Sequence, residues 1–387
     1  MTSFSCCVLA LVVGIVVAAC VEAGDAPAPA DRPLIGAIRW DAWHTPWSKV
    51  RPGHADGPVR AMEISLAPKQ YHYRLPFFAK VVSDKEVKID GYTQATVDQE
   101  IAYAKAGGID YWAFLLYAPD SSMSQGLSLY LSSSRKQDVR FCAIAGPEIF
   151  GDAQVFRERM QRLLKLMAEP SYLKVAGNRP LLYVFRVTDE WLGKWGGREN
   201  ARRLFDDFRA AVKAAGHGDP YLVAMNDNAP DGKKMADAIG AEAITAYAIF
   251  GHGGNNGTPY AQLADAARTF WKACAATGAQ VVPLATAGWD RRPRIEHPVP
   301  WEKWQQPGAG MEKYYQVPAP QELAAHLEDA MRFCLRNKER CPAQAIIVYA
   351  WNEHDEGGWL CPTLNPDGSP NTERLDAIAA MLKAFKP

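Results

Sequence analysis

The densest group of reactive side chains in the sequence is Asn352-Glu353-His354-Asp355-Glu356. It places three carboxylates, one amide and one imidazole in five consecutive residues. Hydrolysis of a glycosidic bond needs two carboxyl groups in different protonation states, one to donate a proton and one to assist displacement. Neighbouring carboxylates acquire different pKa values because ionising both together is costly. The segment therefore predicts acid–base chemistry; the alternative is a solvated acidic turn.

An apolar run directly precedes this segment, and seven similar runs occur earlier in the chain. They are short and rich in β-branched and aromatic residues, which is typical of strands buried on both faces of a parallel sheet. The predicted strands are Leu34–Trp40, Ile109–Tyr117, Val139–Ala145, Pro180–Val187, Tyr221–Met225, Ala243–Phe250, Ala279–Ala285 and Ala345–Trp351. Eight parallel strands close a (β/α)8 TIM barrel, whose active sites lie at the carboxyl ends of the strands.

Amphipathic helical patterns separate these strands. The first is predicted to start at a capping box, Thr96-Val97-Asp98-Gln99, and to stop at Gly107-Gly108. The others are Gln154–Met167, Ala201–Ala214, Tyr260–Cys274, Pro320–Asn337 and Asn371–Phe385. Because strands and helices alternate throughout, residues 34–387 are predicted to form one α/β catalytic domain.

Two connections are much longer than a barrel loop requires. Asp41–Ala95 follows the first strand and Gly288–Ala319 follows the seventh. Both are rich in aromatic residues, in a chain that holds 12 Trp and 15 Tyr. Core packing accounts for part of this aromatic content, but flat rings also stack on sugar faces. Long loops of this kind are usually functional, so both are expected to line the site.

Four segments resemble glycoside hydrolase family 99, the endo-α-mannosidase group, and its WbsX-type relatives. Asn352–Gly357 is similar to the family's Asn-Glu-Trp-x-Glu-Gly motif after the last strand. Gly288–Arg294 resembles its Trp-Asp-x-x-Pro-Arg segment, and Trp43-His44 resembles its aromatic–His turn. Gly107–Tyr117 is similar to the segment that leads into its second strand. The resemblance implies a TIM barrel and a retaining glycoside hydrolase.

The resemblance also assigns roles to the two glutamates. Glu353 would act as a base on the sugar's own 2-hydroxyl, which displaces the leaving group and gives an epoxide-like intermediate. Glu356 would protonate the leaving oxygen and later activate water. The chain departs from the family at His354, where the family has Trp, and at Cys361-Pro362, where Glu-Pro is expected. These departures concern the sugar that is recognised more than the reaction class.

The predicted catalytic residues are therefore Glu353 and Glu356. The predicted substrate-binding residues lie at strand ends and in the long loops: Trp43, His44, Tyr117, Tyr247, Trp289, Asp290, Arg291, Asn352, His354 and Trp359. Neither a cofactor nor a metal is expected, because no Cys-x-x-Cys pair and no His-Glu-x-x-His spacing occurs.

The first 23 residues have the features of an export leader. The apolar run Val8–Ala19 is too short to span a bilayer, which takes about 20 residues. It ends in a lipoprotein-like box at Cys20, whereas the next residues also fit ordinary cleavage before Gly24. Residues 24–33 are predicted to be a flexible tether. The protein is thus expected to be periplasmic, secreted, or an outer-membrane lipoprotein tethered through Cys20.

Equal numbers of acidic and basic residues, 43 each, argue against a nucleic-acid partner. The resemblance implies a carbohydrate substrate. No pattern indicates an oligomeric state. Two other functions stay open: a WbsX-type role in surface polysaccharide synthesis, and a carbohydrate-binding lipoprotein without turnover. Cys334 and Cys341 could form a bridge or remain two thiols, one of them exposed.

Overall fold

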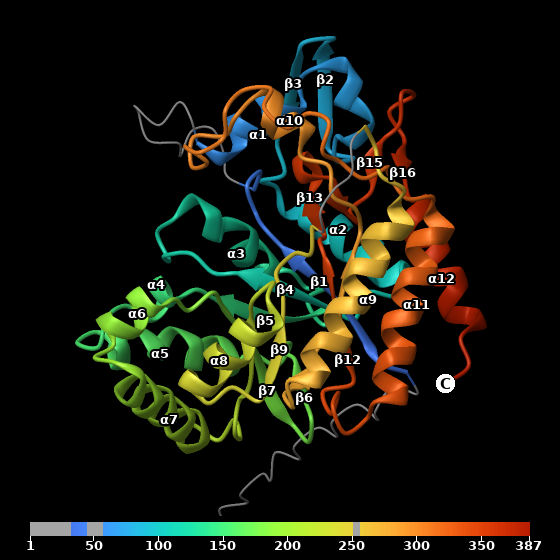
Figure 1. Cartoon of the computed structure of the whole chain (residues 1–387). Helices are drawn as coiled ribbons and strands as arrows, with labels where there is room; N and C mark the ends of the chain where they lie inside the picture. The colour runs from blue at the N-terminus through green and yellow to red at the C-terminus, as the bar shows by residue number, and fades with distance from the viewer. Residues whose placement is uncertain (1–31, 45–56, 251–255) are drawn as a thin grey trace, which may run out of the picture. The chain divides into compact units, whose positions relative to one another are not determined.

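The apolar runs of the sequence form a sheet of parallel strands that curls back on itself. The computed structural model describes residues 32–44, 57–250 and 256–387. The strands follow one another around the sheet in chain order (Figure 1). They are β1 (Leu34–Arg39), β4 (Tyr111–Leu115), β5 (Arg140–Ala145), β7 (Arg179–Phe185), β8 (Tyr221–Met225), β9 (Ala243–Thr245), β10 (Gln280–Val281) with β11 (Leu284–Thr286), and β12 (Ala345–Tyr349). Each position overlaps one of the predicted runs.

The seventh strand position closes the sheet. Its first half, β10, pairs with β9, and its second half, β11, pairs with β12. Between the halves, Val282 N donates to Ile244 O at 3.2 Å and Ile347 N donates to Pro283 O at 3.0 Å. Since β12 also pairs with β1, the strands form a ring. The fold is TIM-barrel-like, as predicted.

Buried side chains fill the middle of this ring. Tyr111 and Tyr183 are fully buried, and their hydroxyl oxygens lie 2.9 Å apart. Tyr111 also donates to Ile346 O at 2.9 Å. A Cβ atom on Gly36 would lie 2.0 Å from the Tyr111 ring, so this position on β1 requires glycine. The barrel interior is a packed core rather than a channel.

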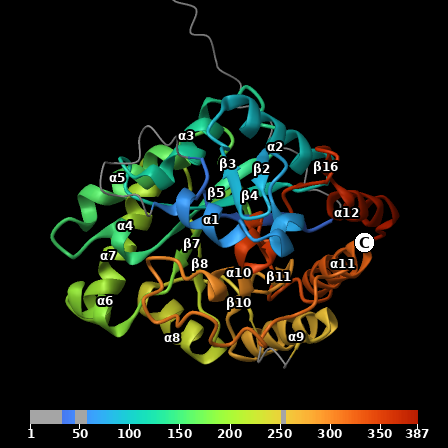
Figure 2. The ribbon, with the colours of Figure 1, turned by 90° about the horizontal axis from the view of Figure 1, so that it is seen from above.

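Helices lie between the strands in the chain and surround them in space (Figure 2). They are α2 (Gln94–Ala106), α3 (Gln125–Ser132), α4 (Pro147–Phe150), α5 (Phe156–Met167), α6 (Asp189–Lys194), α7 (Arg198–Ala214), α8 (Ala229–Ile239), α9 (Tyr260–Ala276), α11 (Pro320–Arg336) and α12 (Glu373–Ala384). The predicted helices overlap α2, α5, α7, α9, α11 and α12.

The predicted start of α2 is wrong by three residues. The helix begins at Gln94, and its N-cap is Thr93, whose side chain accepts a hydrogen bond from Thr96 N at 3.1 Å. Both threonines precede an amphipathic run, and Thr96 has the Gln at the right spacing for a capping box. Thr93 adopts the extended backbone conformation that an N-cap needs, so Thr96 lies inside the helix.

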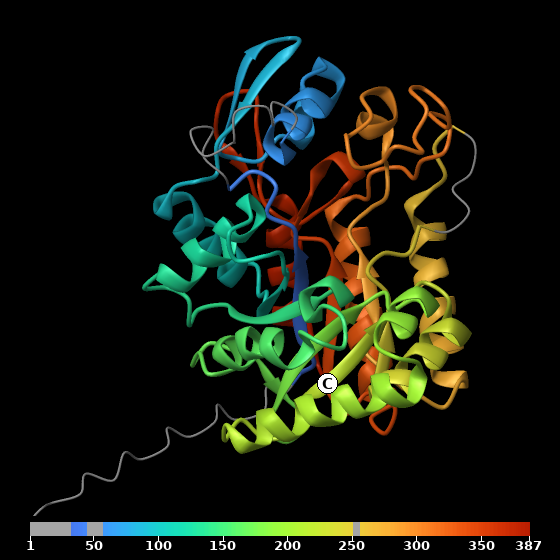
Figure 3. The ribbon, with the colours of Figure 1, turned by 90° about the vertical axis from the view of Figure 1, so that its left-hand side faces the viewer.

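The connection after β1 is folded rather than an open loop. It contains α1 (Pro58–Leu66), η2 (Lys69–Arg74) and a hairpin of β2 (Ala79–Ser83) and β3 (Glu86–Ile89). The connection after β11 contains the short helix α10 (Arg292–Glu296). Figure 3 shows these segments gathered at one end of the barrel. Trp40, Met62 and Val299 pack in one buried cluster there, so the two connections share a small core.

The predicted leader and the tether up to residue 31 lie outside the described residues. Among the helices that the structure describes, none is long and apolar enough to cross a membrane. Cys334 and Cys341 are both buried and both carry free thiols, so Cys341 is not the exposed thiol that one alternative predicted.

Candidate active site

The segment after β12 folds back on itself and presents its acidic side chains at the barrel end. β13 (Asn352–Glu353) pairs antiparallel with β14 (Gly358–Trp359), and the 3-10 turn η4 (His354–Glu356) joins them. Gly357 has a φ of 85°, and a Cβ atom there would lie 2.5 Å from Asp290 N. Asp290 N in turn donates to Glu356 O at 2.7 Å. Glycine is therefore needed where the turn docks against the loop after β11.

One guanidinium holds both predicted catalytic carboxylates. Arg294, on α10, donates from Nη1 to Glu356 Oε1 at 2.6 Å and from Nη2 to Glu353 Oε2 at 3.2 Å. Glu353 is 3% exposed and Glu356 is 8% exposed. The sequence prediction that these two side chains lie together at the mouth of the barrel agrees with this geometry.

Each of the two carboxylates accepts one further hydrogen bond, from a different tyrosine. Tyr247, two residues beyond β9, donates to Glu353 Oε1 at 3.0 Å. Tyr349, the last residue of β12, donates to Glu356 Oε2. Burial, together with the charges of the two glutamates, raises the pKa of both tyrosines well above the ordinary value of 10.0. Both phenols therefore stay protonated and act as donors.

The site holds more carboxylates than guanidiniums. Arg294 also donates from Nε to Asp355 at 2.5 Å and from Nη1 to Glu302 at 3.3 Å. Arg291 donates from Nε to Glu356 at 3.1 Å and from Nη2 to Glu302. Four carboxylates thus share two arginines. This excess of negative charge favours retention of a proton within the group.

Three of the four carboxyl groups have a raised pKa and so favour the protonated form. Burial raises the pKa of Glu353 well above 4.5, the Glu356 carboxylate adds to the increase, and Arg294 only partly opposes it. Burial raises the pKa of Asp355 and of Glu302 as well. Burial alone would lower the pKa of Arg294, but the carboxylates around it outweigh burial and raise that pKa. A protonated and an ionised carboxyl side by side is the arrangement that acid–base catalysis requires.

Several predicted substrate-binding residues are enclosed behind the pair. Asn352 accepts from Trp40 N at 2.8 Å and donates to Trp40 O at 2.7 Å, which fixes β13 to the end of β1. His354 is fully buried, stacks on Trp359 with ring centroids 5.8 Å apart, and meets the edge of Trp43 at 5.0 Å. Its Nδ1 donates to Arg74 O. Burial lowers the pKa of His354 to about 3, so the ring is neutral and supports the turn.

His44 belongs to a second buried network. Its Nε2 lies 2.9 Å from Glu100 Oε2, which also accepts from Arg39 at 2.8 Å. Glu100, on α2, accepts from Trp351 Nε1 at 2.9 Å as well. Burial alone would raise the pKa of Glu100, but the Arg39 guanidinium outweighs it and lowers the pKa to about 2. This network ties α2 and the turn after β1 to the residue just before β13.

The remaining predicted residues lie nearer the pair. Tyr117 accepts from Trp40 Nε1 at 2.8 Å, and Arg291 and Tyr247 contact the two glutamates directly. The half-buried Trp289 ring lies 5.6 Å from the Tyr349 ring. Asp290 instead pairs with Arg74 and Arg292, which outweigh its burial and lower its pKa. Contact of any of these residues with a substrate stays a prediction.

Sequence reasoning missed three residues of the site: Arg294 and Tyr349, which bond the pair, and Glu302, which accepts hydrogen bonds from Arg291 and Arg294. Arg294 ends the Gly288–Arg294 segment on which the resemblance rests, so its position was a usable signal. The apolar run Ala345–Trp351 predicts only a strand position for Tyr349. Its side chain reaches Glu356 because Glu356 turns back over the end of β12. No spacing in the sequence marks Glu302.

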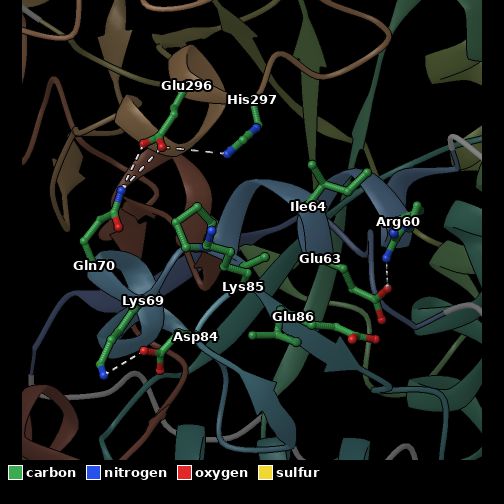
Figure 4. Close-up of a pocket in the computed structure, with 13 residues that line it drawn as sticks. Arg60, Glu63, Ile64, Lys69, Gln70, Asp84, Lys85, Glu86, Glu296 and His297 are labelled. Carbon is green, nitrogen blue, oxygen red and sulfur yellow. Dashed lines mark hydrogen bonds and ion pairs between the residues drawn. The ribbon is translucent and has the colours of Figure 1, made fainter.

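A separate pocket of about 550 Å³ lies beside the folded connection after β1 (Figure 4). Among the described residues its lining comes from 60–70, 84–87 and 296–297, and the residues of 352–359 do not contribute. Glu296, on α10, accepts from Tyr71 at 2.7 Å and from Gln70 at 3.2 Å there. α10 thus presents Arg294 to the carboxylates and Glu296 to this pocket.

Among the solved structures that match the chain over most of its length, two have a similar fold. Both are of a GH99 endo-α-mannosidase from Bacteroides thetaiotaomicron, the second in complex with bis-tris propane. The first is 14% identical with a TM-score of 0.55, and the match covers 92% of this chain and 97% of that one. The second is 13% identical with a TM-score of 0.52 and the same coverage, 92% and 97%. No protein-family model and no curated protein sequence matches the chain. At this identity the likeness shows the fold, and it confirms the predicted resemblance at that level.

Proposed function

We propose that this protein hydrolyses glycosidic bonds with retention of anomeric configuration, using Glu353 and Glu356. The observation that carries the proposal is the position of both carboxylates on one guanidinium, Arg294, at the carboxyl end of the last barrel strand. Active sites of TIM barrels lie at this end. The structural likeness to a GH99 endo-α-mannosidase supports the reaction class.

The resemblance assigns the base to Glu353 and the acid to Glu356. Glu353 would take the proton of the sugar's 2-hydroxyl as that oxygen attacks the anomeric carbon and the glycosidic bond breaks. Glu356 would give its proton to the leaving oxygen. In the second half, Glu356 would take a proton from the incoming water, the C1–O bond of the epoxide-like intermediate would open, and Glu353 would return the proton to the 2-oxygen. Tyr247 and Tyr349 keep each carboxylate oriented.

One observation favours the reverse assignment. Burial raises the pKa of Glu353, and Arg291 and Arg294 both contact Glu356. A protonated Glu353 would be the proton donor. Reaction of a substrate with an activated leaving group separates the two assignments, because such a substrate needs no proton donor.

We further propose that the substrate is a polysaccharide or glycan outside the cytoplasm. The apolar leader and the tether in the sequence support export. A role in surface polysaccharide synthesis would require sugar donors that are made in the cytoplasm. A binding protein without turnover would not need two carboxylates that share one guanidinium. Arginines and tyrosines together donate five hydrogen bonds to this pair.

The test is a screen of polysaccharides for released reducing ends with the wild-type chain. Glu353→Gln and Glu356→Gln should each lose at least about 100-fold in kcat, the lower range for general acid–base assistance. Glu339→Gln is the matched control, because Glu339 is exposed in the turn before β12, at the opposite end of that strand. The proposal fails if both site variants keep wild-type activity, or if NMR of the first product shows inversion.

A further inference from the structure

Exposed aromatic rings are concentrated beside the candidate active site. Trp304 is 66% exposed, Phe250 is 43% exposed and Trp301 is 42% exposed. By contrast, the tryptophans at 40, 43, 112, 195, 271, 351 and 359 are all buried. Placing large apolar rings in water is unfavourable, and a group of them on a surface usually marks a binding site.

The turn that carries Trp301 and Trp304 is held in place from below. Glu302, between them, accepts from Arg291 and from Arg294. Val299, two residues before Trp301, is buried in the small core beneath the turn. Gln305 N donates to Glu302 O at 2.9 Å and closes the turn. The two indole rings are therefore exposed on a fixed support.

These rings are continuous with the carboxylate pair. The guanidinium carbon of Arg291, which bonds Glu356, lies 5.1 Å from the Trp304 ring centroid and 5.9 Å from that of Trp289. Trp289 in turn lies 5.4 Å from Phe250, with only 32° between the ring planes. We call Phe250, Trp289, Trp301 and Trp304 the aromatic ledge. Trp289 and Trp304 lie beside Arg291, which bonds Glu356. Trp301 lies beside Arg294, which bonds both glutamates.

We infer that the aromatic ledge binds successive pyranose rings of a glycan chain on the leaving-group side of the cleaved bond. A pyranose presents an apolar C–H face that suits an aromatic ring, and hydroxyl groups that suit the guanidinium between Trp289 and Trp304. The leaving-group side follows because Arg291 bonds Glu356, the proposed donor to the leaving oxygen. The inference rests on the proposed function and extends it to the length of the substrate.

Binding tests the ledge without turnover. Each variant is made in the full chain with Glu356→Gln and titrated with starch, cellulose, xylan and mannan. Bound glycan should protect tryptophan fluorescence from iodide, and adding Trp304→Ala or Phe250→Ala should weaken binding about tenfold. Trp191→Ala is the matched control, since Trp191 lies on α6, away from α10 (Figures 1 and 2), and its addition should leave affinity unchanged. Equal affinity in all these variants would show that the aromatic ledge does not bind the glycan, even if hydrolysis is confirmed.

Kinetics give the second readout. Against a polysaccharide that the wild type cleaves, Trp304→Ala should raise KM about tenfold, with a much smaller effect on kcat. Against an aryl glycoside, which has no sugar on the leaving-group side, the loss in kcat/KM should be several-fold smaller. Equal losses on both substrates would mean that Trp304 only supports the site. If nothing is hydrolysed but glycan binding still depends on Trp304, the proposed reaction fails while the ledge stands.

Discussion

Arg294 holds Glu356 through a hydrogen bond of 2.6 Å from Nη1 to Oε1. The two residues lie 62 positions apart in the chain and meet because the loop after β11 docks on the turn after β12. Arg294 is 5% exposed, so its charge is compensated by protein carboxylates rather than by water. Arg294 is therefore one of the groups that govern protonation within the pair, because it opposes the effect of burial on Glu353.

Replacing Arg294 by Met should destabilise the protein by about 3–5 kcal/mol near neutral pH, because buried carboxylates lose their partner. Without the guanidinium, the folded-state pKa values of Glu353 and Asp355, which burial already raises, rise further above the unfolded values. These carboxyl groups then leave the free energy of unfolding unchanged in acid and lower it as the pH rises above their unfolded pKa values. Urea unfolding at pH 5 and pH 7.5 should show the larger deficit at pH 7.5. Arg332→Met, a half-exposed arginine paired with Glu328 on α11, should cost under about 1 kcal/mol at both.

Substrates with different leaving groups should identify the proton donor. If Glu356 is the donor, Glu356→Gln loses activity on a glycan but recovers much of it on an aryl glycoside with an acidic phenol. Glu353→Gln then stays inactive on both, because no base acts on the 2-hydroxyl. The opposite pattern would reverse the two roles. A substrate without its 2-hydroxyl should not be cleaved, and cleavage at the normal rate would exclude the epoxide-like route.

Tyr247→Phe should shift the pH dependence of catalysis. The Tyr247 hydroxyl stabilises the ionised form of Glu353, so its loss raises the pKa of Glu353 further. If Glu353 is the base, the acidic limb of kcat/KM moves to higher pH, and activity near neutral pH falls about tenfold. A fall in activity with an unmoved limb would assign Tyr247 to packing alone.

His326→Leu should make the fold less sensitive to acid. His326 is fully buried against the Trp271 ring, and burial lowers its pKa from the ordinary value of 6.5 to about 3. Between these pH values His326 is protonated in the unfolded chain but stays neutral in the folded chain. Each pH unit downward in this window thus costs the wild type about 1.4 kcal/mol from this group. Urea unfolding from pH 7.5 to 4.5 should show a shallower loss in the variant; parallel curves would contradict the prediction.

The native N-terminus should show processing. The protein should be purified from the cell-envelope fraction of the organism that makes it. Mass spectrometry should then find a chain that starts at lipidated Cys20 or at Gly24. A start at Gly24 without lipid would exclude the tether through Cys20, and a start at Met1 would contradict export altogether.

The barrel was predictable because burial on both faces leaves continuous apolar runs in the sequence. Glu353 and Glu356 were predictable because both lie on one short segment after such a run. The start of α2 was less so, since Thr93 and Thr96 offer competing caps and only the backbone conformation of Thr93 selects one. The structured insert at 57–92 was also missed, because its short elements carry no sustained periodicity.

Only the tertiary structure determines which side chains contact Glu353 and Glu356. Tyr247 follows β9, Arg294 and Glu302 lie in the connection after β11, and Tyr349 ends β12. No local sequence pattern relates their side chains. His354 lies between the two glutamates in the sequence, which suggested a role in substrate binding. In the structure its ring is instead buried against Trp43 and Trp359. The sequence by itself determined that Glu353, Asp355 and Glu356 lie together at the barrel end. The packing of the loops determined their partners, and partners and burial together set the charge that each carboxylate carries.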